Sequence, residues 1–165
     1  TNQSGASLVL SSWDQSILDW QRENEIYCVS RENLNSSQIP LNSIDNDDSL
    51  GTKSIFIKIS SHEVIVIESR RNGYWSSGLG GNYGFPPKLE GLLVYKVDTS
   101  IDVNRVSDLG GFAVLQLMPG TKLGNYSRQN LSSFLVKQGQ TLETSGIAIS
   151  LVKSGTFDSV QITKV

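Results

Sequence analysis

A charged step, Glu68-Ser69-Arg70-Arg71, interrupts the most apolar stretch of the sequence. Side chains two residues apart on a strand point to the same face, so we expect Glu68 and Arg70 to share a face and Arg71 to point to the other. A charge in an apolar sheet needs a partner, because an unpaired buried carboxylate takes up a proton. We predict a structural ion-pair network of Glu68, Arg70 and Asp98, and we weigh it against glycan hydrolysis by Glu68 and Asp98.

The only histidine, His62, is followed by Glu63 and so matches the first half of the H-E-x-x-H zinc motif. Val66 stands where the second histidine should be, and the segment has the composition of a strand, so the two ligands could not share a helical face. A Ser-His-Asp triad or a catalytic zinc centre would depend on this one imidazole. We expect His62 to be a solvated turn residue and predict no catalytic residue in the chain.

An acidic turn, Asp45-Asn46-Asp47-Asp48, gathers the oxygen ligands that calcium prefers. It departs from the EF-hand pattern, because Leu50 stands at the sixth position, which that pattern reserves for glycine. Acidic turns are also common as plain solvated loops. Asp45, Asp47 and Asp48 are therefore candidate metal ligands, and calcium is the one cofactor that the sequence suggests.

The segment 72–88 is rich in glycine and carries four aromatic side chains, at Tyr74, Trp75, Tyr83 and Phe85. It is longer than an ordinary hairpin connection, and such loops are often functional or folded over the surface of their own domain. Exposed aromatic faces can stack on sugar rings or contact a protein. We name these four residues as candidate ligand-binding residues, with capping of the core as the alternative.

Length, charge and cysteine content limit the classes of protein to which the chain can belong. The 165 residues suit one domain, 1–165, and the formal charge of −2 with a pI near 5.4 gives no basic footprint for nucleic acid. No apolar run approaches the length of a membrane span. The lone Cys28 forms no internal disulfide, and its apolar neighbours predict a buried, inert thiol.

The surface composition favours an exported protein. Serine and threonine total 33 residues and asparagine 11, a hydroxyl- and amide-rich surface that is more usual outside the cytosol. Four N-x-[ST] sequons, at Asn2, Asn35, Asn125 and Asn130, are candidate glycosylation sites. We expect the protein to be secreted or extracellular, with any leader already removed.

Periodicity predicts a mainly β domain. One short helix within 11–22 would place Trp13, Ile17 and Trp20 on one face, packed on the domain. Runs rich in Val, Ile, Phe and Tyr between turn residues predict strands near 26–30, 38–42, 53–60, 63–70, 90–98, 112–118, 134–144, 147–153 and 158–164. Eight or nine strands exceed what one open sheet holds, so we predict an antiparallel, jelly-roll-like β-sandwich.

Several of these motifs together resemble a family, the immune-inhibitor-A-like secreted zinc metalloproteases, in the region that follows their catalytic domain. The similar segments are Trp13-Asp14, Leu18-Asp19-Trp20, Ile67-Glu68-Ser69-Arg70 and Gly91-Leu92-Leu93-Val94-Tyr95-Lys96-Val97-Asp98. The likeness covers roughly 11–98 and is looser over 139–162. Asp19 replaces the glycine that is usual in the family, and the zinc-binding helix is absent.

The resemblance implies a β-rich accessory region in which Glu68, Arg70 and Asp98 belong to the framework. It also implies a metalloprotease catalytic domain as a partner, and it makes the long 72–88 segment this protein's own addition. We therefore expect a non-catalytic extracellular accessory domain that binds protein or glycan through that segment. The alternative is a structural subunit, or a cleaved C-terminal part, of an active zinc metalloprotease.

Overall fold

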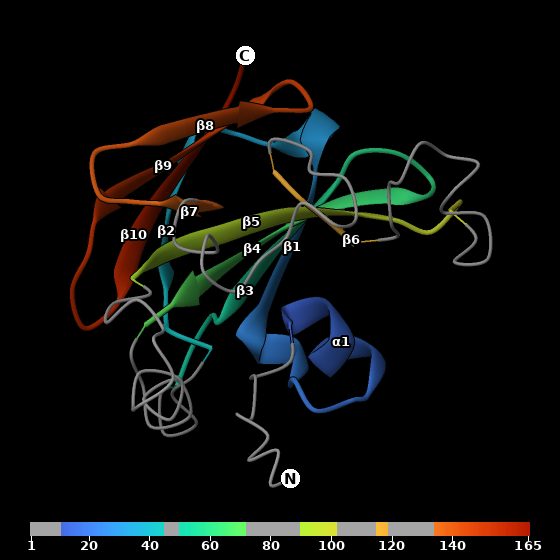
Figure 1. The fold of residues 1–165 in the computed structure, drawn as a ribbon, viewed down its shortest axis with the longest axis horizontal. Helices are drawn as coiled ribbons and strands as arrows, with labels where there is room; N and C mark the ends of the chain where they lie inside the picture. The colour runs from blue at the N-terminus through green and yellow to red at the C-terminus, as the bar shows by residue number, and fades with distance from the viewer. Residues whose placement is uncertain (1–10, 45–49, 72–89, 102–114, 119–133) are drawn as a thin grey trace, which may run out of the picture.

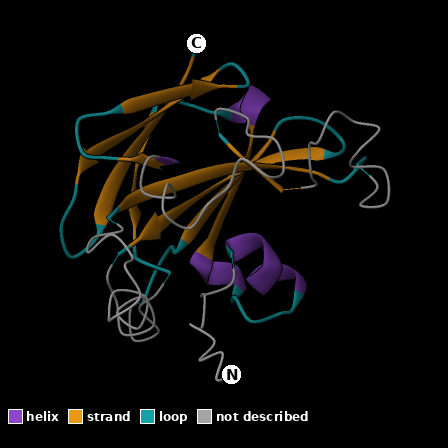
Figure 2. Ribbon diagram, viewed as in Figure 1, coloured by secondary structure: helices purple, strands orange, loops and turns teal. Residues whose placement is uncertain are grey.

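The structure is a computed structural model that describes residues 11–44, 50–71, 90–101, 115–118 and 134–165 (Figure 1). Strands dominate these residues, and the helical segments are short (Figure 2). The helical segments are α1 (Ser12–Ile17) and the 3₁₀ turns η1 (Glu23–Glu25) and η2 (Arg31–Asn33). The strands are β1 (Ile26–Ser30), β2 (Ser37–Leu41), β3 (Ser54–Lys58), β4 (Glu63–Arg70), β5 (Gly91–Asp98), β6 (Leu115–Leu117), β7 (Leu135–Val136), β8 (Thr141–Thr144), β9 (Ile147–Lys153) and β10 (Asp158–Lys164).

Two sheets pack face to face, which confirms the predicted β-sandwich. The first sheet has the order β1-β3-β4-β5-β6, with β7 also paired to β5, and the second has the order β2-β10-β9-β8. The strands that the sequence predicts over 53–60 and 63–70 form an antiparallel hairpin, β3 with β4. All strand pairs are antiparallel except β1 with β3, because the chain leaves β1, adds β2 to the second sheet and then returns.

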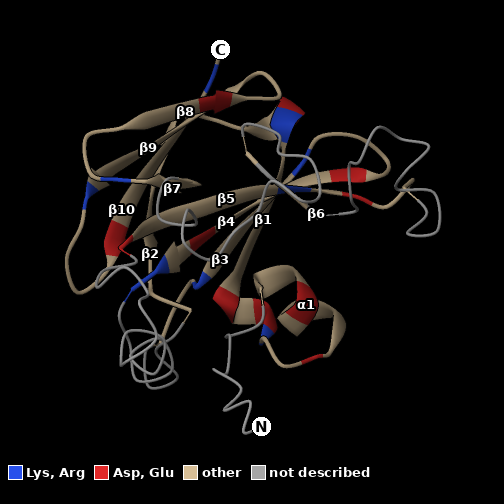
Figure 3. Cartoon of the chain, viewed as in Figure 1, with Lys and Arg blue, Asp and Glu red and all other residues tan. Residues whose placement is uncertain are grey.

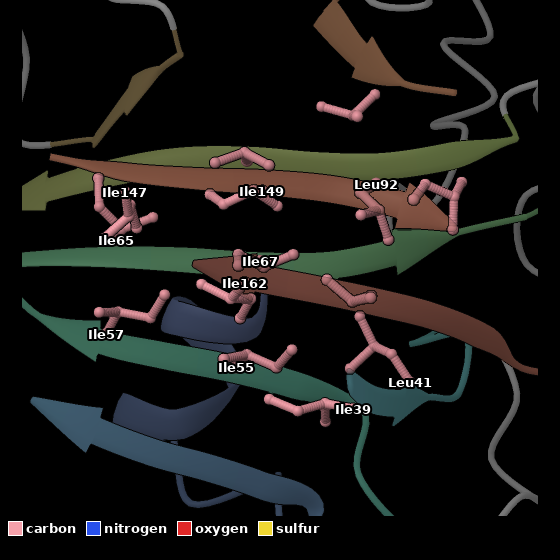
Figure 4. Packing of buried hydrophobic residues seen from close by; sticks show 14 of the residues in the cluster. Ile39, Leu41, Ile55, Ile57, Ile65, Ile67, Leu92, Ile147, Ile149 and Ile162 are labelled. Atoms are coloured by element: carbon pink, nitrogen blue, oxygen red, sulfur yellow. The ribbon is translucent and has the colours of Figure 1, made fainter. Parts of the chain in front are cut away.

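The core between the sheets is built from alternate residues of facing strands. Isoleucines 55, 57, 65 and 67 of the first sheet are fully buried against Ile147, Ile149 and Ile162 of the second (Figure 4). Each such side chain contributes roughly 1.5–3 kcal/mol by leaving water. Val66 points to the opposite face and is also fully buried, so β4 is covered on both sides, as its continuous apolar run predicts.

The strand predicted over 134–144 is in fact two strands in different sheets. β7 pairs with β5 in the first sheet, whereas β8 pairs with β9 in the second. Between them Gly139 has a φ of +81°, a left-handed conformation that breaks the strand. The two-residue turn Ser145-Gly146, with positive φ at both positions, then joins β8 to β9 at the point where the sequence predicts a hairpin turn.

Helix α1 is shorter than predicted, and its expected apolar face is wrong. Ser11 is its N-cap, and the helix ends at Ile17, before Asp19 adopts a φ of +57°. Trp20 therefore lies beyond the helix, and the side chains of Ile17 and Trp20 are 64% and 67% exposed. Only Trp13 of the expected three packs on the sheet, against Phe56 with ring centroids 6.0 Å apart.

The predicted burial of Cys28 is also wrong. Its strand, β1, stands at the end of the strand order in the first sheet, and both Tyr27 and Cys28 are exposed there. Partial burial of the thiol still raises the pKa of Cys28 above its usual value. Within the described residues, no helix is long and apolar enough to cross a membrane.

Gly91 starts β5 at a point where β7 comes unusually close. A Cβ at this position would lie 2.7 Å from the carbonyl oxygen of Val136, and the φ of +146° disfavours any other residue. We expect Gly91→Ala to lower the free energy of unfolding by about 3 kcal/mol in urea titrations. Gly139→Ala is the matched control: its φ is +81°, but an added Cβ would meet nothing within 4 Å, so it should cost only about 1 kcal/mol. Equal costs would contradict the close β5–β7 approach.

Candidate functional site

The charged step at the end of β4 divides its side chains between the two faces of the first sheet. Glu68 and Arg70 lie on the outer face, which carries α1, whereas Ser69 faces Asp158 of the second sheet. Arg71, directly after the strand, also contacts Asp158. Figure 3 colours the acidic and basic positions along the ribbon at this end of β4 and at the start of β10.

Glu68 is fully buried, and both of its carboxylate oxygens are occupied. Oε1 accepts hydrogen bonds from the Arg70 guanidinium, with a Nε–Oε1 distance of 2.7 Å. Oε2 accepts from the backbone N–H of Ser12 at 2.7 Å and from the hydroxyl of Tyr95 at 3.1 Å. The pairing of Glu68 with Arg70 that the sequence predicts is present.

Tyr95 connects this carboxylate to α1. Its hydroxyl donates to Glu68 and accepts a hydrogen bond from the backbone N–H of Trp13 at 3.1 Å. Burial, together with the nearby Glu68 carboxylate, raises the pKa of Tyr95 well above its usual value, so the phenol keeps the proton that it donates. The first turn of α1 therefore has two of its unpaired backbone N–H groups satisfied by the sheet.

A second buried carboxylate, Asp158, ties the other face of the step to β10. Its Oδ2 accepts a hydrogen bond from the Ser69 hydroxyl at 2.7 Å, and its Oδ1 pairs with the Arg71 guanidinium. Arg71 also donates to the Ser154 hydroxyl at 2.9 Å. Sequence reasoning missed Asp158. The available signal was the parity of Arg71, which places its charge on the face opposite Glu68 and so requires a separate partner.

Residues that flank the two predicted ligand-binding segments, 45–49 and 72–89, contact the charged step Glu68–Arg71. Ser43 forms a bridge with Ser69, and the Ile44 N–H donates to the Ser69 carbonyl oxygen at 3.2 Å, directly before 45–49. Arg70 is opposite Gly91 in the last pair of the β4–β5 register, so the described residues on the two sides of 72–89 are also adjacent. Both segments therefore start from one fixed point of the sandwich.

The candidate ligand residues themselves lie outside the described residues. These are the aromatic residues Tyr74, Trp75, Tyr83 and Phe85 and the acidic residues Asp45, Asp47 and Asp48. In the part of the chain that the structure describes, no group of three His, Cys, Asp or Glu side chains is close enough to hold a metal ion.

The expected place of Asp98 in the Glu68 network is wrong. In the β4–β5 register Asp98 is opposite Glu63, whereas Glu68 is opposite Leu93, so the two carboxylates are about 16 Å apart along the sheet. A pair of glycosidase carboxylates needs a separation of roughly 5–10 Å, which excludes hydrolysis by Glu68 and Asp98 together. Asp98 instead accepts hydrogen bonds from the Ser100 N–H and hydroxyl, which outweigh partial burial and lower its pKa.

His62 is exposed in the β3–β4 turn, where the sequence places it. Its Nδ1 lies 3.2 Å from the Ser61 hydroxyl, and its carbonyl oxygen accepts from the Thr99 N–H at 2.9 Å. These contacts join two turns at the end of the sheet that is remote from Glu68.

A third ion pair, also missed, holds the start of β1. The Lys53 ammonium lies 3.0 Å from one carboxylate oxygen of Glu25, and the other oxygen accepts from the Arg22 N–H at 2.9 Å. Burial of Glu25 opposes its ionisation, but the hydrogen bond from Arg22 and the pairing with Lys53 outweigh it and hold the pKa of Glu25 below its usual value.

Comparison of the chain with protein-family models, with curated proteins and with solved structures finds no match. The likeness to immune-inhibitor-A-like metalloproteases therefore stays a prediction.

We expect Glu68→Gln to lower the free energy of unfolding by about 3–5 kcal/mol at neutral pH, because it removes a fully buried carboxylate whose two oxygens both accept hydrogen bonds from the protein. The matched control is Glu63→Gln on the same strand. Glu63 pairs with Lys96 at 2.9 Å, but both side chains are more than a fifth exposed, so the loss should stay below about 1 kcal/mol. Urea unfolding followed by tryptophan fluorescence measures both. A Glu68→Gln cost as small as that of the control would contradict the buried pairing.

Glu25 should make stability depend on acid pH. Because the pKa of Glu25 is lower in the folded than in the unfolded chain, its contribution is complete above about pH 4.5 and is lost as the pH falls through the folded value. The difference in unfolding free energy between the native chain and Glu25→Gln should therefore be constant above about pH 4.5 and shrink as the pH falls further, through the folded value. Glu23→Gln is the control, because it removes a negative charge from the same 3₁₀ turn at an exposed position. A pH-independent Glu25 difference would exclude this linkage.

Proposed function

We propose that the protein is a non-catalytic, extracellular accessory β-sandwich of an exported metalloprotease-like protein, and that it binds protein or glycan through the segment 72–88. The observation that carries the proposal is the pair of buried ion pairs, Glu68 with Arg70 and Arg71 with Asp158, at the base of this segment. They fix the point where the segment leaves the sheet.

A structural role for these charges supports a binding function over a catalytic one. A general acid or base has to reach a substrate proton, whereas Glu68 is fully buried and both of its oxygens accept hydrogen bonds from the protein. Asp158 is equally buried and occupied. Neither carboxylate is placed to act on a bound molecule.

The rigid base also suits recognition. Binding residues are concentrated on connecting segments that a rigid scaffold positions, and Tyr and Trp supply large contact areas for protein or sugar. The segment 72–88 combines these side chains with a start at two ion pairs and an end at the constrained Gly91. A precisely placed base reduces the entropy that such a segment loses on binding.

The motifs that carry the family resemblance have structural roles that agree with an accessory framework. Glu68 and Arg70 pair with each other, and Gly91 occupies a position that excludes other side chains. Asp19 has a φ of +57°, a left-handed conformation that favours glycine, and the resembled family has glycine at this position. These roles support a shared framework, in which Asp98 has no contact with Glu68.

The second candidate, a structural subunit or cleaved C-terminal part of an active zinc metalloprotease, has one observation in its favour. Ile17, Leu18 and Trp20 at the end of α1 are 64%, 49% and 67% exposed, and large exposed apolar side chains close together in the chain are typical of contact surfaces. In that case α1 would pack against the catalytic part.

The test is to print glycans and extracellular-matrix proteins on arrays and to compare the native chain with Trp75→Ala. We expect the variant to lose at least about tenfold in retained signal, because tryptophans that become buried in an interface often carry most of its binding energy. Its free energy of unfolding should stay within about 1 kcal/mol of the native value. Trp20→Ala is the matched control, since it removes an exposed tryptophan from another element and should leave retention unchanged.

Two outcomes would overturn the proposal. If Trp75→Ala destabilises the chain by several kcal/mol, the segment caps the core, which is the competing interpretation of the sequence. If the native chain is retained by neither array, or if Trp20→Ala abolishes retention as completely as Trp75→Ala, the segment 72–88 is not the binding surface.

A further inference from the structure

Among the described residues, strand β1 has a neighbouring strand on one side only. It pairs with β3 and ends the strand order of the first sheet. Figure 4 shows β1, in blue, beside β3 on the side away from β4. Tyr27 and Cys28, in the middle of the strand, are exposed. An open strand edge of this kind is a template for pairing with another chain.

The backbone of β1 shows which of its groups face this open edge. The carbonyl oxygen of Glu25 accepts a hydrogen bond at 2.7 Å from the N–H of Lys53, directly before β3, so it points towards β3. Ile26 is extended, with a φ of −113° and a ψ of 121°, and successive peptide groups of an extended chain point in opposite directions. The groups that point away from β3 are therefore the carbonyl of Ile26 and the N–H and carbonyl groups of Cys28 and Ser30.

The other sheet edges carry features that oppose such pairing. At the ends of the second sheet, β2 contains Pro40, which has no N–H, and β8 has only four residues and carries the exposed Glu143. The other end of the first sheet is formed by β6 and β7, of three and two residues. Proline, charge and short length are the usual means of blocking an edge. The five residues of β1 include neither proline nor a charge, so β1 is the edge best suited to pairing.

We propose that β1 pairs with β1 of a second copy of this chain, antiparallel and about a two-fold axis at Cys28, so that the two first sheets become one. The axis places Cys28 opposite Cys28, and the two residues exchange both of their N–H···O=C bonds. The Ser30 N–H of each copy then donates to the Ile26 carbonyl oxygen of the other. The Ile26 N–H already donates to the Glu23 carbonyl oxygen of its own chain. Every N–H that β1 directs outward thus has an acceptor.

The side chains of β1 match one another in this register. Tyr27 of one copy lies opposite Val29 of the other, in a pair without mutual hydrogen bonds, where cross-strand side chains are closest. An aromatic residue opposite a β-branched one is a favourable pair, and β1 brings no like charges together. Both residues share the inner face with Ile55 and Ile57, so pairing also covers Tyr27, which is 38% exposed. This self-complementarity favours a second copy, in a closed two-fold dimer, over an unrelated extended peptide.

The proposal goes beyond the function assigned to 72–88 and is independent of it. That segment leaves the sheet at the end of β4, and β3 separates β4 from β1. Loss of glycan or protein retention in Trp75→Ala and loss of the dimer in a β1 variant are therefore separate results.

The experiment follows the mass and the amide exchange of the full chain as its concentration is raised. We expect sedimentation equilibrium to show a reversible dimer with a dissociation constant on the order of 100 μM, because a single strand edge is a small interface. The amides of Cys28 and Ser30 should exchange more slowly as the dimer forms. The amides of Tyr27 and Val29, which point towards β3, should exchange slowly at every concentration.

Ser30→Pro tests the edge directly. Ser30 has a φ of −85°, close to the range that proline adopts, and its N–H points away from β3, so proline removes a donor from the edge and suits the observed backbone. The dimer should weaken by at least about tenfold, since both symmetry-related bonds are lost. Tyr27→Lys should also weaken it, because it places a cation at the edge. The matched control is Val152→Lys, at an exposed apolar residue of the interior strand β9, and it should leave the mass distribution unchanged.

Three results would overturn the proposal. A chain that stays monomeric at about 1 mM does not pair through β1. If the amides of Cys28 and Ser30 are protected in a chain that is monomeric at every concentration, another segment of the same chain covers the edge. A dimer that persists unchanged in both Ser30→Pro and Tyr27→Lys uses a different surface.

Discussion

The alternation of side chains at the end of β4 is the constraint on which the rest of the site depends. Because successive residues point to opposite faces, four consecutive polar residues place one buried ion pair on each side of the sheet. The Glu68–Arg70 pair holds the helix α1 against the outer face of the first sheet. The Arg71–Asp158 pair holds the second sheet against its inner face. A register shift of one residue would exchange the faces, so that Glu68 would lose its hydrogen bonds from Ser12 and Tyr95. Asp158 would lose both Ser69 and Arg71.

These pairs specify a position more than they stabilise the fold. Removing two charges from water costs nearly as much as their attraction returns, and apolar residues of similar size would often serve stability equally well. Apolar contacts are not directional, however, and so do not specify a single partner. The buried carboxylates of Glu68 and Asp158 each accept hydrogen bonds from groups on other elements, so only one arrangement of α1, β4 and β10 satisfies both. The described residues next to the segments 45–49 and 72–89 are therefore held in one position.

The sequence predicts the strands well because their information is local. Period-two burial and turn residues place β4, β9 and β10 at their observed bounds, and Glu68 with Arg70 is visible as two charges of equal parity. The pairing of Arg71 with Asp158 joins residues 87 apart in different sheets, and no local pattern encodes it. Asp98 was misplaced for the same reason: its parity on β5 does not reveal its position in the register, which puts it opposite Glu63.

The charged residues at the two ends of β10 differ in their burial and in their partners. At one end the carboxylate of Asp158 is fully buried and paired with Arg71, which is what a fixed base requires, whereas at the other end Lys164 is exposed and its ammonium donates to a backbone carbonyl oxygen. Between these ends Val160 and Ile162 are fully buried in the close-packed core and allow β10 no second register. A strand with one arrangement offers no pair of states for a ligand to bias, so the base of the segment 72–88 should be the same with and without a bound ligand.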